Sequence, residues 1–221
     1  MVVGLPSANM VDMGEKESGT RKSRRHSGVI ISASIILATS GSDPRSTLQY
    51  MLTKRSGDHP MLAGAMCFPG GTFSSADDSA KWRSLFSAQG INLSEIGFLS
   101  QSAHRPQIYR RELTDPESLP HEISLRITAI RETFEECGIL LCVRGGGRGR
   151  ENFSASAFQK REDIMKWQQM VSKDPWNFLV LCEQHDCVPD LEALYEWNNW
   201  TTPGYGCLMF DTSFMFYSLL C

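Results

Sequence analysis

Three glutamates within a short segment are the strongest indication of chemistry in this chain. Glu132, Glu135 and Glu136 follow Arg131 in a segment that ends at Gly138. On a helix, residues three and four positions apart share a face, so these carboxylates would crowd onto one patch. Like charges at that spacing repel each other by roughly a few tenths of a kcal/mol per pair. Because oxygen ligands suit hard divalent cations, the patch predicts a metal site.

The same segment also has an apolar side. Apolar residues recur at spacings of three and four, which predicts a helix packed on a core; they are Ile123, Ile127, Ile130, Phe134, Cys137 and Leu141. Gly138 is a suitable C-terminal stop for this helix. We therefore expect one buried side and an acidic cluster on the other, at the edge of the folded domain.

The composition limits the class of protein. A length of 221 residues fits one domain with elaborations, or at most two small ones. A net charge of −3 gives no reason to expect nucleic acid as a partner. No apolar run is long enough to cross a bilayer, and the oligomeric state stays open. Seven cysteines without CxxC pairs indicate free thiols in a reducing compartment.

Two other patterns resemble sites but have simpler explanations. Cys182, His185 and Cys187 lie close together, but a structural zinc site normally needs a fourth ligand, so zinc is not expected. The glycine-rich residues 145–149 lack the spacing of a phosphate-binding loop and are expected to be a connector. The tryptophans are expected to fill the core rather than to stack on a base.

Alternating hydrophobic patterns and turn residues predict an α/β fold. Residues 1–27 are polar and end in a basic run, which predicts a mobile leader before a domain at 28–221. Residues 78–122 contain three prolines and are expected to be a loop-like insertion outside the core. The chain stops inside an apolar strand, which predicts truncation or an alternative ending. Strands are expected at 29–38, 48–55, 65–68, 139–143 and 209–220, and helices at 80–89, 155–172, 175–184 and 189–197, besides the acidic helix.

Two separated segments together resemble the box of the Nudix hydrolases, GX5EX7REUXEEXGU. Gly71 begins the box, and residues 131–139 match its second half. Asp77 stands where the box has its first glutamate, and Thr133 stands where an aliphatic residue is usual. Because 53 residues separate Asp77 from Arg131, where the box has seven, the insertion would split the box.

The segment before the box narrows the resemblance. Nudix enzymes that act on coenzyme A carry a signature of the form LLTxRSxxLRxxxGxVxFPGG. His59 and Pro60 replace its Leu-Arg pair. The matching residues fall at the same spacings; they are Leu52 to Ser56, Gly64, Met66 and Phe68 to Gly71. Over residues 29 to 217 the chain is similar to the coenzyme A diphosphatases, and its insertion resembles the peroxisomal acyl-coenzyme A branch.

The resemblance implies a fold, a reaction and a cofactor. The fold would be the Nudix α/β/α sandwich, a mixed sheet between helices, with a long insertion in the box. The reaction would be hydrolysis of the diphosphate of coenzyme A or acyl-coenzyme A to 3′,5′-ADP and (acyl-)4′-phosphopantetheine, with Mg²⁺ or Mn²⁺. The alternatives are a Nudix hydrolase of another nucleoside diphosphate derivative, or an inactive module that binds a nucleotide or a protein.

The resemblance also assigns roles on the acidic helix. Glu132, Glu135 and Glu136 would bind the metal, and Arg131, Glu135 and Glu136 would be the catalytic residues. Arg131 would orient the carboxylates, by pairing with Asp77. The general base stays open between one of the glutamates and a residue of a later loop.

The residues expected to contact the substrate come from the earlier signature. Gly70 and Gly71 would let the backbone approach the phosphates or the metal closely. Lys54 and Arg55 would bind the negative substrate, including its 3′-phosphate, with solvated charges at a strand end as the alternative.

The expected location also follows from the resemblance. The relatives use a C-terminal peroxisomal address, which predicts the peroxisome. The final residues, Leu219 to Cys221, are not such an address, so mitochondrion and cytoplasm are the alternatives.

Overall fold

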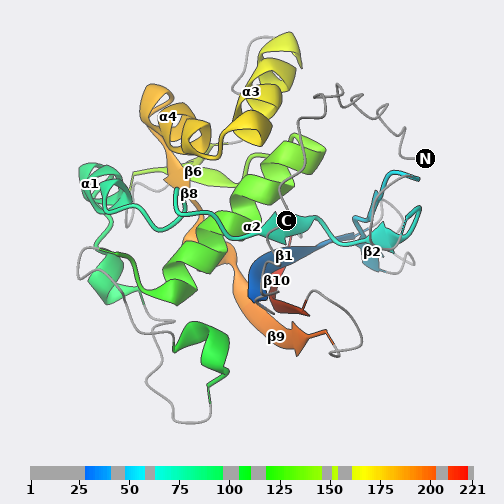
Figure 1. Cartoon of the computed structure of the whole chain (residues 1–221). Coiled ribbons are helices and arrows are strands. Elements are labelled where there is room, and N and C mark those ends of the chain that lie inside the picture. The colour runs from blue at the N-terminus through cyan, green and yellow to red at the C-terminus, as the bar shows by residue number, and fades with distance from the viewer. Residues whose placement is uncertain are drawn as a thin grey trace, which may run out of the picture.

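The protein was analysed as a computed structural model, which describes residues 28–40, 48–57, 63–96, 105–110, 118–145, 151–153, 161–202 and 209–218. The leader, and the expected strand's last residues 219–220, lie outside this part of the chain. The helices are α1 (Lys81–Ala88), α2 (His121–Cys137), α3 (Arg161–Lys173) and α4 (Trp176–Gln184), with short 3₁₀ turns η1 (Leu93–Glu95), η2 (Gln107–Tyr109) and η5 (Leu191–Ala193) (Figure 1). The strands are β1 (Val29–Ser40), β2 (Leu48–Tyr50), β3 (Thr53–Lys54), β4 (Met66–Cys67), β5 (Gly70–Thr72), β6 (Cys142–Arg144), β7 (Glu151–Phe153), β8 (Val188–Pro189), β9 (Tyr195–Thr201) and β10 (Met209–Ser218).

The main sheet joins the early and the late part of the described chain. Its order is β2-β1-β10-β9, and β5 also pairs with β1. β1 and β10 run parallel, from Val29 opposite Met209 to Ala38 opposite Ser218, whereas the other pairs are antiparallel. The sheet is therefore mixed, as expected. Two smaller sheets pair β3 with β4 and arrange β7-β6-β8.

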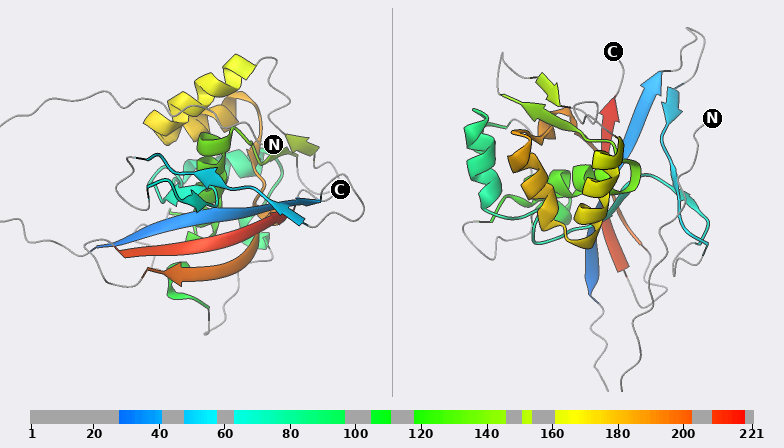
Figure 2. Two further views of the ribbon diagram at one scale, coloured as in Figure 1. Left: turned by 90° about the vertical axis from the view of Figure 1, so that its right-hand side faces the viewer. Right: turned by 90° about the horizontal axis from the view of Figure 1, so that it is seen from above.

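The residues of β1 alternate between two environments. Ala33, Ile35 and Leu37 are buried in the core, whereas Ser34 and Ile36 on the other face are only half-buried. Successive side chains of a strand point to opposite faces, so this alternation separates a core face from a second face. Figure 2 shows α2, α3 and α4 gathered on one side of the sheet.

Helix α2 runs through the centre of the molecule (Figure 1). Residues 121–131 are all buried, so the expected open side is limited to the end of the helix, where Glu132 and Glu135 are half-buried and Glu136 is exposed. The helix is enclosed because η2 covers its start, where His121 Nδ1 donates a 2.6 Å hydrogen bond to the carbonyl of Ile108. It ends at Gly138, whose φ of 68° is left-handed, which confirms the predicted stop.

Several described residues of the insertion belong to the core, which corrects the prediction of a loop-like segment outside it. Trp82 and Phe86 of α1 are 1% exposed, and Leu119 is fully buried. The Trp82 ring packs at 6.0 Å from Phe178 of α4, and its Nε1 donates a 2.9 Å hydrogen bond to the carbonyl of Ala76. The elements of this segment are short, but they still place large apolar side chains inside.

Other expected elements differ in detail. The helix expected at 189–197 is wrong, because η5 is followed by β9, whose pairing with β10 outweighs local helix propensity. The strand expected at 48–55 is interrupted at Met51 and Leu52, and its two parts join different sheets. The strand expected at 139–143 corresponds to β6, which begins only at Cys142. The remaining expected helices correspond to α1, α3 and α4, with residues 155–160 outside the described part.

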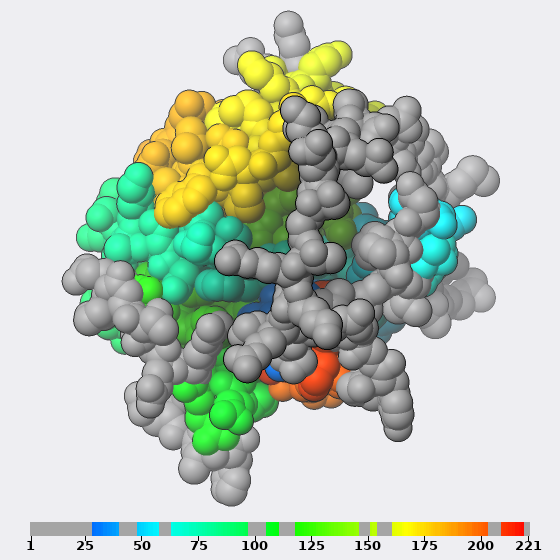
Figure 3. Space-filling view, in the orientation of Figure 1, coloured from blue at the N-terminus to red at the C-terminus, as the bar shows by residue number. Residues whose placement is uncertain are grey.

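The α/β class with a mixed sheet is confirmed. In the space-filling view α3 and α4 form a continuous outer surface (Figure 3). Within the described ranges, none of the helices combines the length and the apolar character that crossing a membrane requires.

Candidate active site

Arg131 connects the two separated halves of the box. Its Nε donates to Asp77 Oδ1 at 2.8 Å and its Nη2 to Asp77 Oδ2 at 2.9 Å, a bidentate pair of two almost fully buried side chains. Nη1 donates to Glu132 at 2.9 Å and also to Glu135, and Nη2 donates to the carbonyl of Thr72 at 2.9 Å. The expected pairing with Asp77 is therefore present, and folding brings together residues that the insertion separates.

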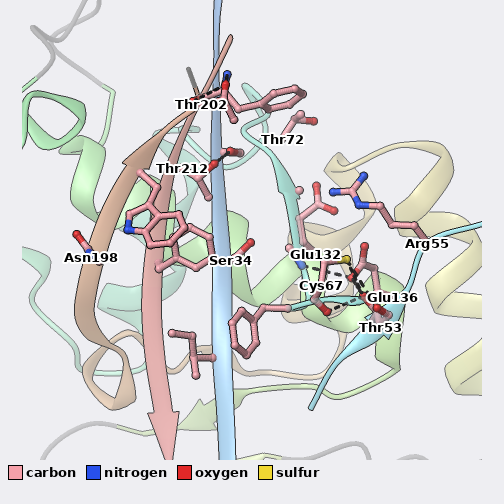
Figure 4. A pocket seen from close by; sticks show the side chains of 18 of the residues that line it. Ser34, Thr53, Arg55, Cys67, Thr72, Glu132, Glu136, Asn198, Thr202 and Thr212 are labelled. Carbon is pink, nitrogen blue, oxygen red and sulfur yellow. Dashed lines mark hydrogen bonds between the residues drawn. The ribbon is translucent and has the colours of Figure 1, made fainter. Parts of the chain in front are cut away.

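Glu136 is held by residues from the earlier signature. Thr53 Oγ1 and the Gly70 backbone N–H donate to its Oε2 at 3.4 and 3.3 Å (Figure 4). Thr53 belongs to β3 and Gly70 to β5, so both strands converge on the last turn of α2. The hydrogen bonds fix the carboxylate beside the Pro-Gly-Gly segment.

Gly70 and Gly71 allow a close approach between strand and helix. Gly70 has φ +153°, and a Cβ there would collide with the backbone of Ala33 and Ser34. A Cβ on Gly71 would instead collide with the carboxylate of Glu132. The absence of both side chains lets β5 lie against β1 and against the Glu132 carboxylate.

Burial changes the protonation of these groups. It raises the pKa of Glu132 to about 7, against the attraction of Arg131 and with added repulsion from Glu135. Burial also raises the pKa values of Glu135 and Glu136. Burial alone would lower the pKa of Arg131, but its hydrogen bonds to Asp77 raise it above the ordinary value. The glutamates therefore bear a charge cost that a bound cation would relieve.

One pocket contains most of the predicted site residues. It has a volume of about 970 Å³, in the range of small-molecule sites. Lys54, Arg55, Gly70, Gly71, Glu132 and Glu136 all line it. Glu135 and Arg131 do not line it; Arg131 lies behind the glutamates and holds Glu135 by a hydrogen bond.

The donor set fits a hard divalent cation. Glu132 and Glu136 supply carboxylate oxygens into the same pocket. Burial raises the pKa of each, and neither Arg131 beside Glu132 nor the hydrogen bonds to Glu136 fully offset the rise. Mg²⁺ and Mn²⁺ prefer such oxygen ligands. Glu132 and Glu136 would hold the ion directly, whereas Glu135 is oriented toward Arg131.

The sequence pattern did not reveal the opposite end of this pocket. We define the aromatic wall as Trp197 and Trp200 of β9 with Phe210 and Phe214 of β10, all of which line the pocket. The alternation of Phe210, Thr212 and Phe214 could have indicated one shared strand face. The expected helix at 189–197 hid the corresponding pattern in β9.

A second group of side chains meets in the core. The sulfur atoms of Cys142, Cys182 and Cys187 lie within 4.8 Å of one another, and all three residues are buried. Cys142 was not anticipated, whereas the His185 ring packs against Phe153 and Trp167. Burial raises the pKa values of the Cys142 and Cys182 thiols.

Three curated relatives are similar to this chain in sequence. The acyl-coenzyme A diphosphatase NUDT19 of Xenopus laevis is 36% identical over 178 residues, which cover 76% of this chain and 47% of the relative. The protein of the same name from Gallus gallus is 36% identical, covering 82% and 53%, and that of Homo sapiens is 32% identical, covering 77% and 50%. The chain thus spans about half the length of the curated relatives it matches.

A solved structure supports the fold. The crystal structure of a NUDIX hydrolase from Alicyclobacillus acidocaldarius matches with a TM-score of 0.58 and 21% identity, over 87% of this chain and 70% of that one. The family model described as the NUDT19 Nudix domain matches residues 24–221. On this match, the chain belongs to the NUDT19 Nudix domain family.

Proposed function

We propose that the protein hydrolyses the diphosphate bond of coenzyme A or acyl-coenzyme A, giving 3′,5′-ADP and (acyl-)4′-phosphopantetheine. The observation that carries the proposal is one pocket in which Glu132 and Glu136 face Lys54 and Arg55. It is supported by membership of the NUDT19 Nudix domain family, whose matched relatives bear the name acyl-coenzyme A diphosphatase.

The cofactor in this proposal is Mg²⁺ or Mn²⁺. Held by Glu132 and Glu136, such an ion would neutralise the charge of the diphosphate and activate water. Arg131 Nη1 orients the Glu132 carboxylate by a 2.9 Å hydrogen bond to its Oε1. Thr53 and the Gly70 N–H orient Glu136. These contacts position the carboxylates before the substrate binds.

Lys54 and Arg55 supply positive charge at the same end of the pocket. The guanidinium of Arg55 lies near the acidic cluster, as Figure 4 shows. Burial raises the pKa of Glu136, and the charge of Arg55 opposes that rise less than the hydrogen bonds from Gly70 and Thr53 do. In the proposed complex these two residues bind the diphosphate and the 3′-phosphate of the nucleotide half. Gly70 and Gly71 line the same pocket, and in the proposed complex the phosphates approach their backbone.

The proton of the attacking water needs an acceptor near the glutamates. The candidates are one of the glutamates and a residue of a later loop; of the three glutamates, Glu132 and Glu136 line the pocket. Glu135 is held by Arg131 and would act by shaping the cluster.

The peroxisomal location remains a prediction from the family resemblance, to be checked by imaging the tagged protein in cells.

The experiment measures release of 3′,5′-ADP from coenzyme A and acyl-coenzyme A with and without Mg²⁺ or Mn²⁺. Glu136→Gln should reduce metal-dependent turnover on the order of a thousandfold, because about 4 kcal/mol of transition-state stabilisation depends on the ion. Glu183→Gln is the matched control, since Glu183 is exposed on α4 and outside the pocket. Circular dichroism establishes that each variant is folded.

Three results would contradict the proposal. Turnover that survives Glu136→Gln would place the chemistry elsewhere. Hydrolysis of a nucleotide sugar or a dinucleotide in preference to coenzyme A would identify another diphosphate substrate. A folded wild-type chain without turnover on any of these compounds would favour the binding module.

A further inference from the structure

The two ends of the pocket differ in their chemistry. Glu132, Glu136 and Arg55 lie on one side of β1, and the strands β9 and β10 lie on the other (Figure 4). The side chains of β9, of β10 and of Thr202, which follows β9, that line the pocket in the described chain are all uncharged; they are Trp197, Asn198, Trp200, Thr202, Phe210, Thr212 and Phe214. The pocket therefore runs from a charged end to the aromatic wall.

Strand register explains why the wall faces the pocket. Thr212 pairs with Ser32 and Trp200, and Phe214 pairs with Ser34 and Asn198. Directly paired residues point to the same face of a sheet, so these positions share the face opposite to the core. The wall is thus an extension of the active-site pocket and separate from the core.

The wall is an ordered aromatic surface. The ring of Phe214 packs edge-to-face against Phe68 at 6.5 Å and against Trp200 at 6.1 Å. Trp200 and Trp197 are nevertheless 63% and 67% exposed. Tryptophan contributes a large apolar area, so the neighbours hold Trp200 in position and leave much of its surface for an apolar ligand.

Charge decides which half of the substrate fits each end. If the diphosphate lies at the glutamates, the nucleotide half still carries its 3′-phosphate, whereas the acyl-pantetheine half carries no further charge. A phosphate placed against uncharged aromatic side chains would lose solvation without a partner, but Lys54 and Arg55 would pair with it. An acyl chain, by contrast, gains about fourfold in affinity for each methylene that it buries.

We infer that the aromatic wall is the subsite for the acyl-pantetheine half, and that it sets the preference for the acyl group. This inference rests on the proposed function. It assigns Trp200 and Phe214 to substrate selection, a role distinct from the chemistry at Glu132 and Glu136.

The test compares kcat/KM for coenzyme A, hexanoyl-coenzyme A and decanoyl-coenzyme A in the wild type and in Trp200→Ala. We expect the ratio of decanoyl-coenzyme A to coenzyme A to fall at least tenfold in Trp200→Ala. Tyr195→Ala should leave the ratio unchanged, because Tyr195 is a 66% exposed aromatic residue of the same strand that does not line the pocket. An equal loss for all three substrates in Trp200→Ala would instead indicate that adenine stacks on the wall, and would overturn the inference.

A binding measurement separates this inference from the proposed reaction. Calorimetry on the wild type should find decanoyl-4′-phosphopantetheine bound more tightly than 4′-phosphopantetheine, and Trp200→Ala should reduce the difference at least tenfold. Absence of turnover together with this result would refute the reaction and keep the subsite. Turnover without any acyl-dependent binding difference would refute the subsite and keep the reaction.

Discussion

Two arginines of the same helix illustrate two uses of a buried charge. The side chains of Arg126 and Arg131 in α2 are only 1% and 2% exposed. Arg131 forms a bidentate pair with Asp77, whereas Arg126 donates a 3.0 Å hydrogen bond to Glu196 and another to the carbonyl of Glu122. Burial lowers the pKa of Arg126, but Asp77 raises that of Arg131. Both arginines contact a carboxylate, so the difference follows from the bidentate geometry and the burial of Asp77, against the partly exposed Glu196.

The partners of the two arginines divide α2 into two working halves. Arg131 joins β5 and Asp77 to Glu132 and Glu135, at the side of the pocket. Glu196 of β9 also accepts from Arg105 of the insertion, which pairs with Glu122. The second half of α2 therefore organises the site, and the first half fixes the insertion and β9 to the helix.

The largest expected effect comes from removing Arg131, the centre of the network that it forms with Asp77, Glu132 and Glu135 (the first network). Arg131→Met should lower the free energy of unfolding by about 3–5 kcal/mol, because it leaves the charge of the buried Asp77 without its partner. Urea denaturation measures the loss. Adding Asp77→Asn should recover part of it, since the second change removes the orphaned charge. A loss below about 1 kcal/mol would mean that the pair contributes little.

Arg126 belongs to a network with Arg105, Glu122 and Glu196 (the second network), and its removal should have a smaller effect. Arg126→Met should lower the free energy of unfolding by about 1.5–3 kcal/mol, since Glu196 and Glu122 keep Arg105 as a partner. Turnover per folded molecule should stay at the wild-type level at temperatures well below the melting point. If Arg126→Met changes the dependence on Mg²⁺, the division of α2 into two halves is wrong.

A glycine beside the first network distinguishes loss of stability from loss of the site. A Cβ at Gly71 would displace the Glu132 carboxylate without meeting backbone atoms among its three nearest contacts. Gly71→Ala should therefore weaken Mg²⁺ activation about 10–100-fold while the urea midpoint changes little. Gly70→Ala is the contrasting variant, because its Cβ would collide with the backbone of β1 and should lower stability. Equal stability losses in both would contradict this account.

The smallest expected effect concerns the rim of the second network. Glu196 has a side chain that is 28% exposed, so water screens part of its interaction with the arginines. Glu196→Gln should lower the free energy of unfolding by about 1 kcal/mol or less, because the amide of Gln keeps an acceptor oxygen for Arg126 and Arg105 keeps Glu122. A small fall in the thermal midpoint would measure the loss. A loss as large as that of Arg131→Met would show that the two networks are equivalent.

Much of the site at the second half of α2 could be predicted from local sequence. The spacing of Glu132, Glu135 and Glu136 placed them on one helix end, and the apolar period and Gly138 defined that helix. The pairing of Arg131 with Asp77 was predicted across the insertion, since the residues of the box imply it. The signature before the box correctly brought Lys54, Arg55 and Gly70 to the same pocket as Glu136.

The segments that the first half of α2 holds, which are the insertion and β9, were predicted poorly. The core contacts of Trp82 and Phe86 were missed because prolines and charged residues dominate the local pattern of the insertion. Glu196 and Trp197 were expected in a helix, but β9 pairs with β10 through contacts that no short window contains. The consequence was that the aromatic wall went unnoticed.

The sequence by itself determined the acidic cluster, the helix that carries it and the family to which the box belongs, because these depend on residues close together or at fixed spacings. Only the tertiary structure decided that α2 is central, that Trp82 and Phe86 of the insertion lie in the core, and that β9 and β10 extend the pocket beyond the glutamates. Those properties depend on pairing and burial between distant segments, whose free energy is gained only when the whole chain folds.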